Sequence, residues 1–373
     1  MRSGYKDLIC LLACAVNGIT PDASAVRAMD IDSIYTLAKA HTLRGCVHIV
    51  LEKAGVEDEK FTQAYKKALR KIIYLDIERG AITEEMEKRG IWYMPLKGAL
   101  LKDLYPENGM REMTDIDMLF DASRAAEMRD IMTARGYTVE SYAKKHHDIY
   151  LKPPVLNFEM HTMLFDPDTI FHEYYKDPMR LMVRDEGNKF GYHFSDEDFY
   201  IFMLAHEYKH YSRSGTGLRS LLDCYVFMKN KMDTLDMEYV RRQTDELGIT
   251  DFEREQRELA FKVFSSEAFP ELSKKEQEML DYFISSNTYG FRSRAADNTI
   301  KRYYQSSGDK SRSGFIKARL FPEKEFMARR YPKLYPCPLL RPLAYIFRWG
   351  KGIAVNRVKL TAELKALKRY NKS

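Results

Sequence analysis

An Asp-x-Asp pair at the start of a short apolar run constrains this chain more than any other feature. The segment 109–122 reads Gly-Met-Arg-Glu-Met-Thr-Asp-Ile-Asp-Met-Leu-Phe-Asp-Ala. Successive side chains of a strand alternate between its faces, so Asp115 and Asp117 point one way and the apolar residues point the other way. Two carboxylates this close repel each other unless a cation lies between them. A hard divalent ion such as Mg²⁺ or Mn²⁺ satisfies both acids and can also carry substrate phosphates.

A strand, a Lys-Gly turn and a short helix are predicted just before the acidic pair, within residues 91–105. Gly98 allows a ligand to approach the backbone closely, and the helix that follows begins with free N–H groups. Lys97 adds a positive charge at the same turn, and Arg111 lies between this turn and the acids. The segment therefore predicts a phosphate-binding turn beside the acidic pair.

A third carboxylate comes from the segment 155–161, which reads Val-Leu-Asn-Phe-Glu-Met-His. Its alternation places Glu159 and His161 on one face of a strand. The run 146–151 predicts a neighbouring strand, and the Pro-Pro pair after it predicts the turn between the two. Glu159 is suited to hold a second metal ion or to act as a general base, and the sequence leaves both roles open.

These motifs resemble the nucleotidyltransferase core of the polymerase β type, and more closely a bacterial nucleotidyltransferase-like family. The matching motifs are Leu96-Lys97-Gly98, Tyr105-Pro106, the run from Arg111 to Asp117, and Glu159-x-His161. The resemblance implies an α+β fold, with a small mixed nucleotidyltransferase-type sheet flanked by N-terminal and C-terminal helical regions. It also implies a Mg²⁺-dependent transfer of a nucleoside monophosphate from an NTP such as ATP. The acceptor would be a hydroxyl of a small molecule or a protein, and pyrophosphate would leave.

The resemblance also suggests roles for individual residues. The metal and catalytic roles go to Asp115, Asp117 and Glu159. The nucleotide-binding roles go to Lys97, Gly98, Arg111, Thr114 and Lys209, with His161 and Asp223 as further candidates. Lys97-Gly98 stands where the superfamily usually has Gly-Ser. Whether this turn binds the triphosphate through a hydroxyl or through the lysine is therefore left open.

A helix after the core of related proteins carries a Lys, then an Arg and an Asp, and Lys209, Arg219 and Asp223 look similar. In that arrangement Asp223 orients Lys209. The alternative is a simple surface pair between Arg219 and Asp223, because residues four apart on a helix are neighbours.

Two other functions stay open. One is a catalytically silent nucleotide-binding or regulatory module of the same fold. The other is a zinc-dependent hydrolase, because His206, Glu207 and His210 match the H-E-x-x-H pattern on a helix. The extended zinc motif requires Gly at position 213 and His at position 216, where this chain has Arg213 and Thr216. We therefore expect the transferase rather than the hydrolase.

Composition divides the chain into four regions: 1–89, an N-terminal helical region; 90–190, the nucleotidyltransferase-like core; 191–300, a helical domain; and 301–373, a basic, aromatic-rich segment. The last region holds 19 Lys and Arg against 4 Asp and Glu, whereas residues 1–300 hold 41 against 50. Its bases alternate with aromatic and apolar residues. We expect it to pack on the acidic body, with contact to a membrane surface as an alternative and nucleic acid as the weakest partner.

Sequence features also predict a cytoplasmic location. No apolar run approaches the roughly 18 residues that a membrane span requires. The five cysteines are scattered and odd in number, which is typical of reduced thiols. The apolar run 8–16 resembles a signal peptide, but the Asn17-Gly18 pair after it is typical of a helix end, so we expect a core helix.

Overall fold

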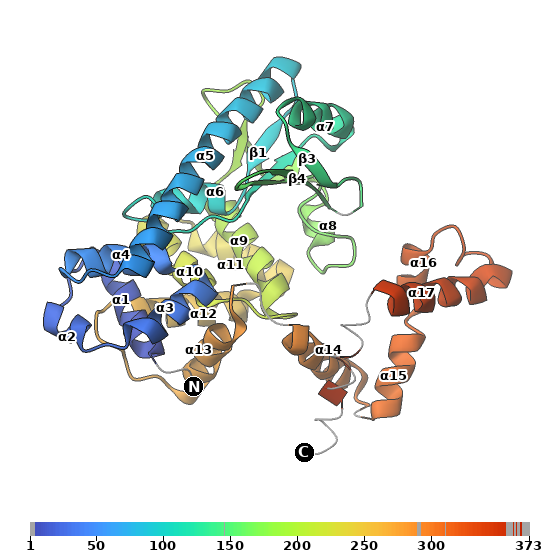
Figure 1. Ribbon diagram of the computed structural model, residues 1–373. Coiled ribbons are helices and arrows are strands. Elements are labelled where there is room, and N and C mark those ends of the chain that lie inside the picture. Colours follow the sequence, from blue (N-terminus) through green and yellow to red (C-terminus); the bar gives the residue numbers. More distant parts are fainter. Residues whose placement is uncertain are drawn as a thin grey trace. The chain divides into compact units, whose positions relative to one another are not determined.

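A computed structural model describes residues 4–144, 146–288, 292–309 and 311–355, together with residues 361, 363, 366 and 367. Its contacts divide the chain into two compact units (Figure 1). The first unit contains residues 1–209 and 217–288, and the second contains residues 210–216 and 289–373. Every candidate site residue named above except His210 falls in the first unit.

The first unit begins with five helices. They are α1 (Tyr5–Asn17), α2 (Ala23–Arg27), α3 (Ile31–His41), α4 (Arg44–Lys53) and α5 (Glu59–Arg89). The apolar N-terminal run forms α1, whose Leu8 and Leu12 are fully buried and which packs against α3, α4 and α12 (Thr250–Phe264). Gly18 ends α1 in the left-handed conformation, with a φ of 68°. This run is therefore a core helix, as expected.

A five-stranded mixed sheet follows, drawn from residues 93–161 as the sequence predicted. Its strands are β1 (Tyr93–Pro95), β2 (Ile116–Phe120), β3 (Thr138–Ser141), β4 (His147–Lys152) and β5 (Leu156–His161). Their order in the sheet is β1-β2-β5-β4-β3. The central pair, β2 and β5, is parallel, and the other three pairs are antiparallel. The α+β class expected from the motifs is confirmed.

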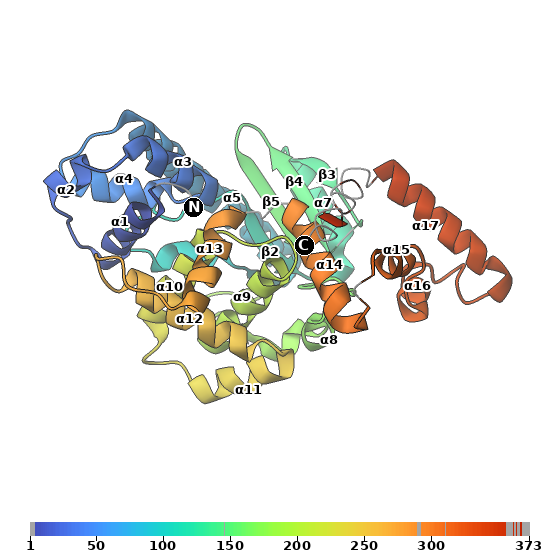
Figure 2. The same cartoon turned by 90° about the horizontal axis from the view of Figure 1, so that it is seen from below.

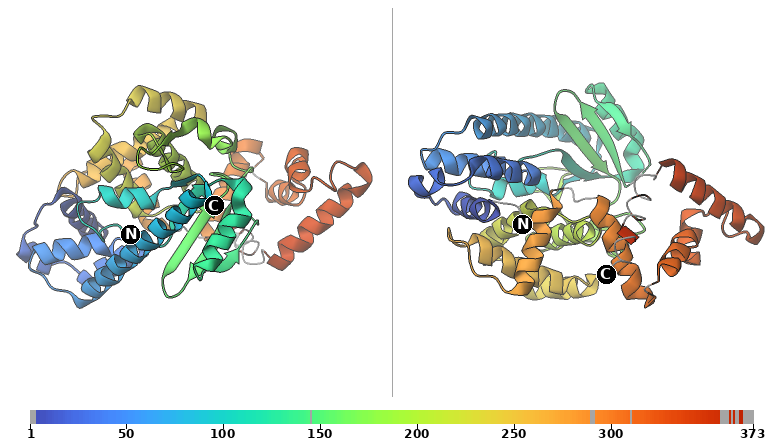
Figure 3. Two further views of the ribbon diagram at one scale, coloured as in Figure 1. Left: turned by 90° about the horizontal axis from the view of Figure 1, so that it is seen from above. Right: turned by 60° about the horizontal axis from the view of Figure 1, so that its bottom comes forward.

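Apolar side chains from alternate strand positions fill one face of the sheet. Ile116, Met118 and Phe120 from β2 meet Phe158 and Met160 from β5 in one buried cluster. The helices α5 and α7 (Ala125–Ala134) cover this face, and Figure 3 shows the long α5 running along the strands. The polar side chains of the same strands therefore lie on the other face.

Short elements connect these strands and lead to a second helical group. The connecting elements are α6 (Gly98–Leu101), η1 (Lys102–Leu104), η2 (Ala122–Arg124), α8 (His172–Tyr175), η3 (Pro178–Leu181), β6 (Met182–Arg184) and β7 (Tyr192–Phe194). The helices are α9 (Asp196–Tyr211), α10 (Leu218–Lys231), α11 (Met237–Leu247), α12 and α13 (Lys274–Ser286). Figure 2 shows α10, α12 and α13 packed together.

The second unit is helical and has its own small apolar clusters. Its elements are α14 (Arg292–Ser307), α15 (Arg312–Leu320), α16 (Lys324–Arg330), η4 (Pro338–Leu340) and α17 (Arg341–Val355). Phe315 and Met327 are buried in two separate clusters. Ile346 and Phe347 of α17 are 56% and 61% exposed. The expectation that this segment packs on the acidic first unit stays a prediction.

No helix among the described residues is long and apolar enough to cross a membrane. All five cysteines are free thiols, and Cys337 is the one that is exposed. Cys46 and Cys224 lie in the core of the first unit, where burial raises the pKa of both thiols. These two cysteines therefore contribute apolar packing rather than reactivity.

Candidate functional site

The acidic residues of the predicted site lie on two neighbouring parallel strands. The pairing of β2 with β5 sets Asp117 beside Glu159, and the next alternate position of β5 is His161. Each of these three side chains offers a ligand atom within 4.8 Å of the other two. The parallel pairing thus joins residues that are as much as 44 positions apart in the sequence.

Lys97 lies in the turn between β1 and α6, and its ammonium group reaches the acids. Its Nζ is 3.2 Å from Asp117 Oδ1. The turn is held to β2 because the Leu96 N–H donates to the Asp117 carbonyl at 3.0 Å. Lys97 has a φ of 45°, a left-handed conformation that costs about 1 kcal/mol or more for a lysine. This strained turn directs the cation toward the acidic cluster, as predicted, whereas its contact with a phosphate stays a prediction.

The carboxyl groups of the cluster differ in their electrostatics. Burial would raise the pKa of Asp117, but the Lys97 ammonium and a hydrogen bond from His161 hold that pKa well below its usual range. Burial lowers the pKa of His161 to about 4, so its neutral ring donates Nε2–H to Asp117 Oδ1 at 2.8 Å. Burial and the two nearby aspartates raise the pKa of Glu159 to about 7. Glu159 is therefore the acid best suited to exchange a proton near neutral pH.

Asp115 lies one residue before β2 and is surrounded by different groups. Thr114 Oγ1 donates to Asp115 Oδ1 at 3.0 Å. Burial and Asp117 raise the pKa of Asp115, against the positive charges of Lys97 and Arg219. Lys71 of α5 donates to the Thr114 carbonyl at 2.7 Å and also interacts with Asp115. Sequence reasoning missed Lys71, because nothing distinguishes it from the other lysines of that long helix.

One of the comparisons with known proteins identifies a family. A family model described as an uncharacterised nucleotidyltransferase matches residues 27–265. The chain belongs to this nucleotidyltransferase family. No curated protein and no solved structure matches the chain. The matched region includes the whole sheet together with α9 and α10, so the family assignment made from the motifs is confirmed.

Arg111 has a different position from the one predicted. Its Nε and one terminal nitrogen donate to the two Asp223 oxygens at 2.8 and 2.9 Å, and the other terminal nitrogen donates to Met113 Sδ. Tyr105 Oη also donates to Asp223, at 2.7 Å. Arg111 is buried and committed to α10, so the expectation that it assists Lys97 at the nucleotide is corrected to a structural role. A Cβ on Gly98 would lie 2.6 Å from Arg111, so Gly98 allows packing inside the protein.

Asp223 is likewise engaged in a different pair from either one predicted. It accepts hydrogen bonds from Arg111 and Tyr105, and the prediction that it orients Lys209 stays untested. Arg219 donates to Thr42 Oγ1 at 2.8 Å. Lys209 lies over the Phe165 ring at 5.5 Å, and its charge acts on Glu159. Lys209 is thus near the acidic cluster, and its contact with a phosphate stays a prediction.

The H-E-x-x-H pattern on α9 does not form a recognisable metal centre. Glu207 is buried and accepts from Gln256 Nε2 at 2.7 Å, and burial raises its pKa to about 8. Within the described part of the chain, the groups with metal-ligand spacing contain neither His206 nor His210. The hydrolase alternative therefore has no supporting geometry.

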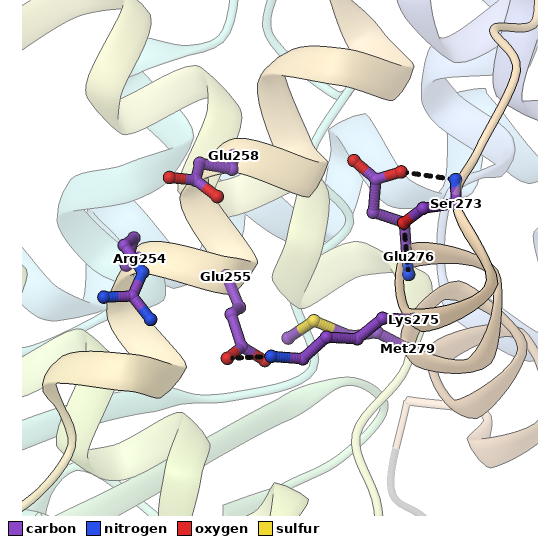
Figure 4. A pocket seen from close by; sticks show the side chains of 7 residues that line it. All are labelled: Arg254, Glu255, Glu258, Ser273, Lys275, Glu276 and Met279. Carbon is purple, nitrogen blue, oxygen red and sulfur yellow. Dashed lines mark hydrogen bonds and ion pairs between the residues drawn. The ribbon is translucent and has the colours of Figure 1, made fainter.

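A surface pocket lies apart from the acidic cluster, on α12 and α13 (Figure 4). Its lining residues are Arg254, Glu255, Glu258, Ser273, Lys275, Glu276 and Met279. Lys275 and Glu255 form an ion pair in it at 2.6 Å. None of its lining residues is a predicted site residue, so we do not place the active site there.

Proposed function

We propose that this chain is a divalent-metal-dependent nucleotidyltransferase that moves a nucleoside monophosphate from an NTP to a hydroxyl of a small molecule or protein. The observation that carries the proposal is the parallel pairing of β2 and β5, which sets Asp117 beside Glu159 with Lys97 in contact. Family membership supports the reaction class. The cytoplasm, where NTPs are abundant, is the location that fits such an activity.

The donor set fits a hard divalent cation. Asp117 and Glu159 supply carboxylate oxygens within 4.8 Å of each other, and oxygens are the ligands that Mg²⁺ and Mn²⁺ prefer. Asp117 and the adjacent Asp115 would hold the metal, and Glu159 is either a further ligand or the general base. When bound, such ions offset the negative charge on the phosphates and on the attacking and leaving oxygens.

The chain's own residues have separable tasks in this transfer. The acceptor oxygen forms a bond to the α-phosphorus while the bond from that phosphorus to the pyrophosphate breaks. Glu159 accepts the hydroxyl proton, for which its pKa of about 7 is suited. The ammonium of Lys97 offsets the charge that develops on the pyrophosphate. His161 keeps the Asp117 carboxylate oriented through its 2.8 Å hydrogen bond.

The test is transfer of radiolabel from α-³²P-labelled NTPs to components of a cell lysate with Mg²⁺ or Mn²⁺ present. The wild type should label at least one component, and Asp117→Asn should abolish the labelling. Asp121→Asn is the matched control, because Asp121 follows the same strand and caps η2, which asparagine can also do. If the wild type binds NTP but labels nothing, the silent binding module is the correct function.

A further inference from the structure

Three histidines gather beside the acidic cluster, and two of them, His146 and His147, have no part in the transfer proposed above. His147 begins β4 and faces His161 across the antiparallel pairing with β5, and His146 immediately precedes it. One ligand atom of each histidine lies within 4.8 Å of those of the other two. His146 Nε2 and His147 Nδ1 are 3.0 Å apart, about the ligand–ligand spacing of a tetrahedral site whose Zn–N bonds are about 2.0–2.1 Å.

Each of the three histidines has one ring nitrogen near a carboxylate. The three pairs are His146 Nδ1 and Asp166 Oδ1 at 2.9 Å, His147 Nε2 and Glu159 Oε2 at 3.7 Å, and His161 Nε2 and Asp117 Oδ1 at 2.8 Å. Histidines that bind metals usually donate their second N–H to a carboxylate, which fixes the tautomer. Of the three, His161 makes this hydrogen bond, and a cation would replace the 3.0 Å contact between the facing ring nitrogens of His146 and His147.

The His161 ring gives a second, independent indication of a ligand. Its Nδ1 is buried and has no hydrogen-bond partner among the described residues, and His161 is only 3% exposed. A buried polar atom without a partner costs roughly 1–3 kcal/mol. Because His161 Nε2 carries the proton that it donates to Asp117, Nδ1 offers a lone pair and is a potential metal ligand.

We propose that His146, His147 and His161 bind a dication of the Zn²⁺ class, with a fourth coordination position open to solvent or substrate. Imidazole nitrogens suit zinc, copper and nickel, whereas Mg²⁺ and Mn²⁺ prefer the carboxylate oxygens beside them. The charge balance permits a dication, because three carboxylates adjoin the rings, and the ammonium groups that act on the rings, among the described residues, are Lys97 and Lys209.

This ion would also act on the acidic cluster. His161 belongs both to the histidine group and to the group formed with Asp117 and Glu159. A cation on His161 Nδ1 would fix the ring that donates to Asp117 and so hold that carboxylate in one orientation. The inference does not depend on the transfer reaction, because metal binding alone tests it.

The experiment is a titration of the tag-free, chelator-treated full chain with Zn²⁺ by calorimetry, followed by Co²⁺ absorption to report the coordination geometry. The wild type should bind one equivalent and show the visible bands of four-coordinate cobalt. The double variant His146→Gln with His147→Gln should lose at least 100-fold in affinity. The matched control is His206→Gln with His210→Gln, which removes the pair of histidines on α9 and should bind like the wild type.

Asp166→Asn leaves all three histidines in place and should weaken zinc binding by about 10–100-fold, because only the carboxylate behind His146 changes. If circular dichroism shows that the double variant does not fold, the zinc affinity of Asp166→Asn still tests the proposal. Absence of stoichiometric zinc on the wild type would overturn the proposal. Equal affinity in the wild type and His146→Gln with His147→Gln would also overturn it. So would a loss of zinc caused by His206→Gln with His210→Gln.

Discussion

Asp117 and Glu159 lie side by side on parallel strands, but burial affects their carboxyl groups differently. Asp117 has two donors in contact, the Lys97 ammonium at 3.2 Å and the His161 ring at 2.8 Å. Among the described residues, Glu159 has a weaker contact, with the His147 ring nitrogen 3.7 Å away. Asp117 therefore stays ionised, whereas Glu159 holds a proton up to about pH 7. Asp117 is therefore suited to hold a negative charge, and Glu159 is suited to exchange a proton.

Glu159 gives the chain a distinct dependence of stability on pH. Its pKa is about 7 when folded against an ordinary value of 4.5, so the folded chain binds more protons than the unfolded chain between these values. Its contribution to the free energy of unfolding therefore falls as pH rises from about 4.5 to 7, by roughly 3 kcal/mol in total. Relative to the wild type, Glu159→Gln should be more stable at pH 8 than at pH 5 by about this amount.

Urea unfolding in metal-free buffer at the two pH values measures this difference. The control is Glu140→Gln, a substitution at an exposed position on β3, for which the difference from the wild type should change little with pH. If the stability of Glu159→Gln relative to the wild type were the same at pH 5 and pH 8, folding would not raise the pKa of Glu159.

Among the structural elements, the loop between η1 and β2 is anchored by one buried polar cluster. Arg111 reaches both oxygens of Asp223 on α10, and Tyr105 donates to the same carboxylate. Both charged residues are less than 10% exposed. This cluster ties the loop that leads into β2 to α10, and it therefore helps to fix the positions of Asp115, just before β2, and of Asp117 within it.

Removing one partner of this ion pair should be strongly destabilising. Arg111→Met leaves Asp223 buried with the Tyr105 hydroxyl as its remaining donor, and the expected loss is about 3–5 kcal/mol in the free energy of unfolding. Thermal and urea unfolding provide the measurement. The control is Arg254→Met, which removes an exposed ion pair with Asp251 and should change stability by less than about 1 kcal/mol. If both variants lost the same small amount, the buried pair would not anchor the loop.

Local sequence patterns predicted the parts of this site that depend on strand alternation. The alternation of residues 115–120 and 156–161 placed apolar side chains on one face of the sheet and acids on the other, as the burial of Met118 and Met160 shows. The same patterns did not show that Arg111 pairs with Asp223, 112 residues away, because side-chain partners at that distance are determined by tertiary packing. They also did not show that Lys97 already neutralises Asp117, because the position of its ammonium depends on an unusual backbone φ.

The second unit combines positive charge with exposed apolar side chains. The region after residue 300 holds 19 basic residues against 4 acidic ones. Leu339 of η4 is 87% exposed, and Ile346 and Phe347 of α17 are more than half exposed. A helix that presents apolar side chains together with Lys and Arg has the chemistry of a segment that lies in the interface of an anionic membrane. The second unit therefore has two possible partners, the acidic first unit and an anionic membrane, and experiment can distinguish them.

Vesicle binding distinguishes these possibilities. We expect the full chain to sediment with vesicles that contain phosphatidylserine and not with vesicles of phosphatidylcholine alone, because the basic charge requires an anionic surface. Raising the salt from 50 to 300 mM should weaken binding, since the Debye length shortens. Leu339→Ser with Phe347→Ser should reduce binding at least tenfold, whereas Ile170→Ser, at an exposed apolar position in the first unit, should not. If the chain binds neither vesicle type and its C-terminal region resists trypsin despite 19 basic residues, that region packs on protein instead of a membrane.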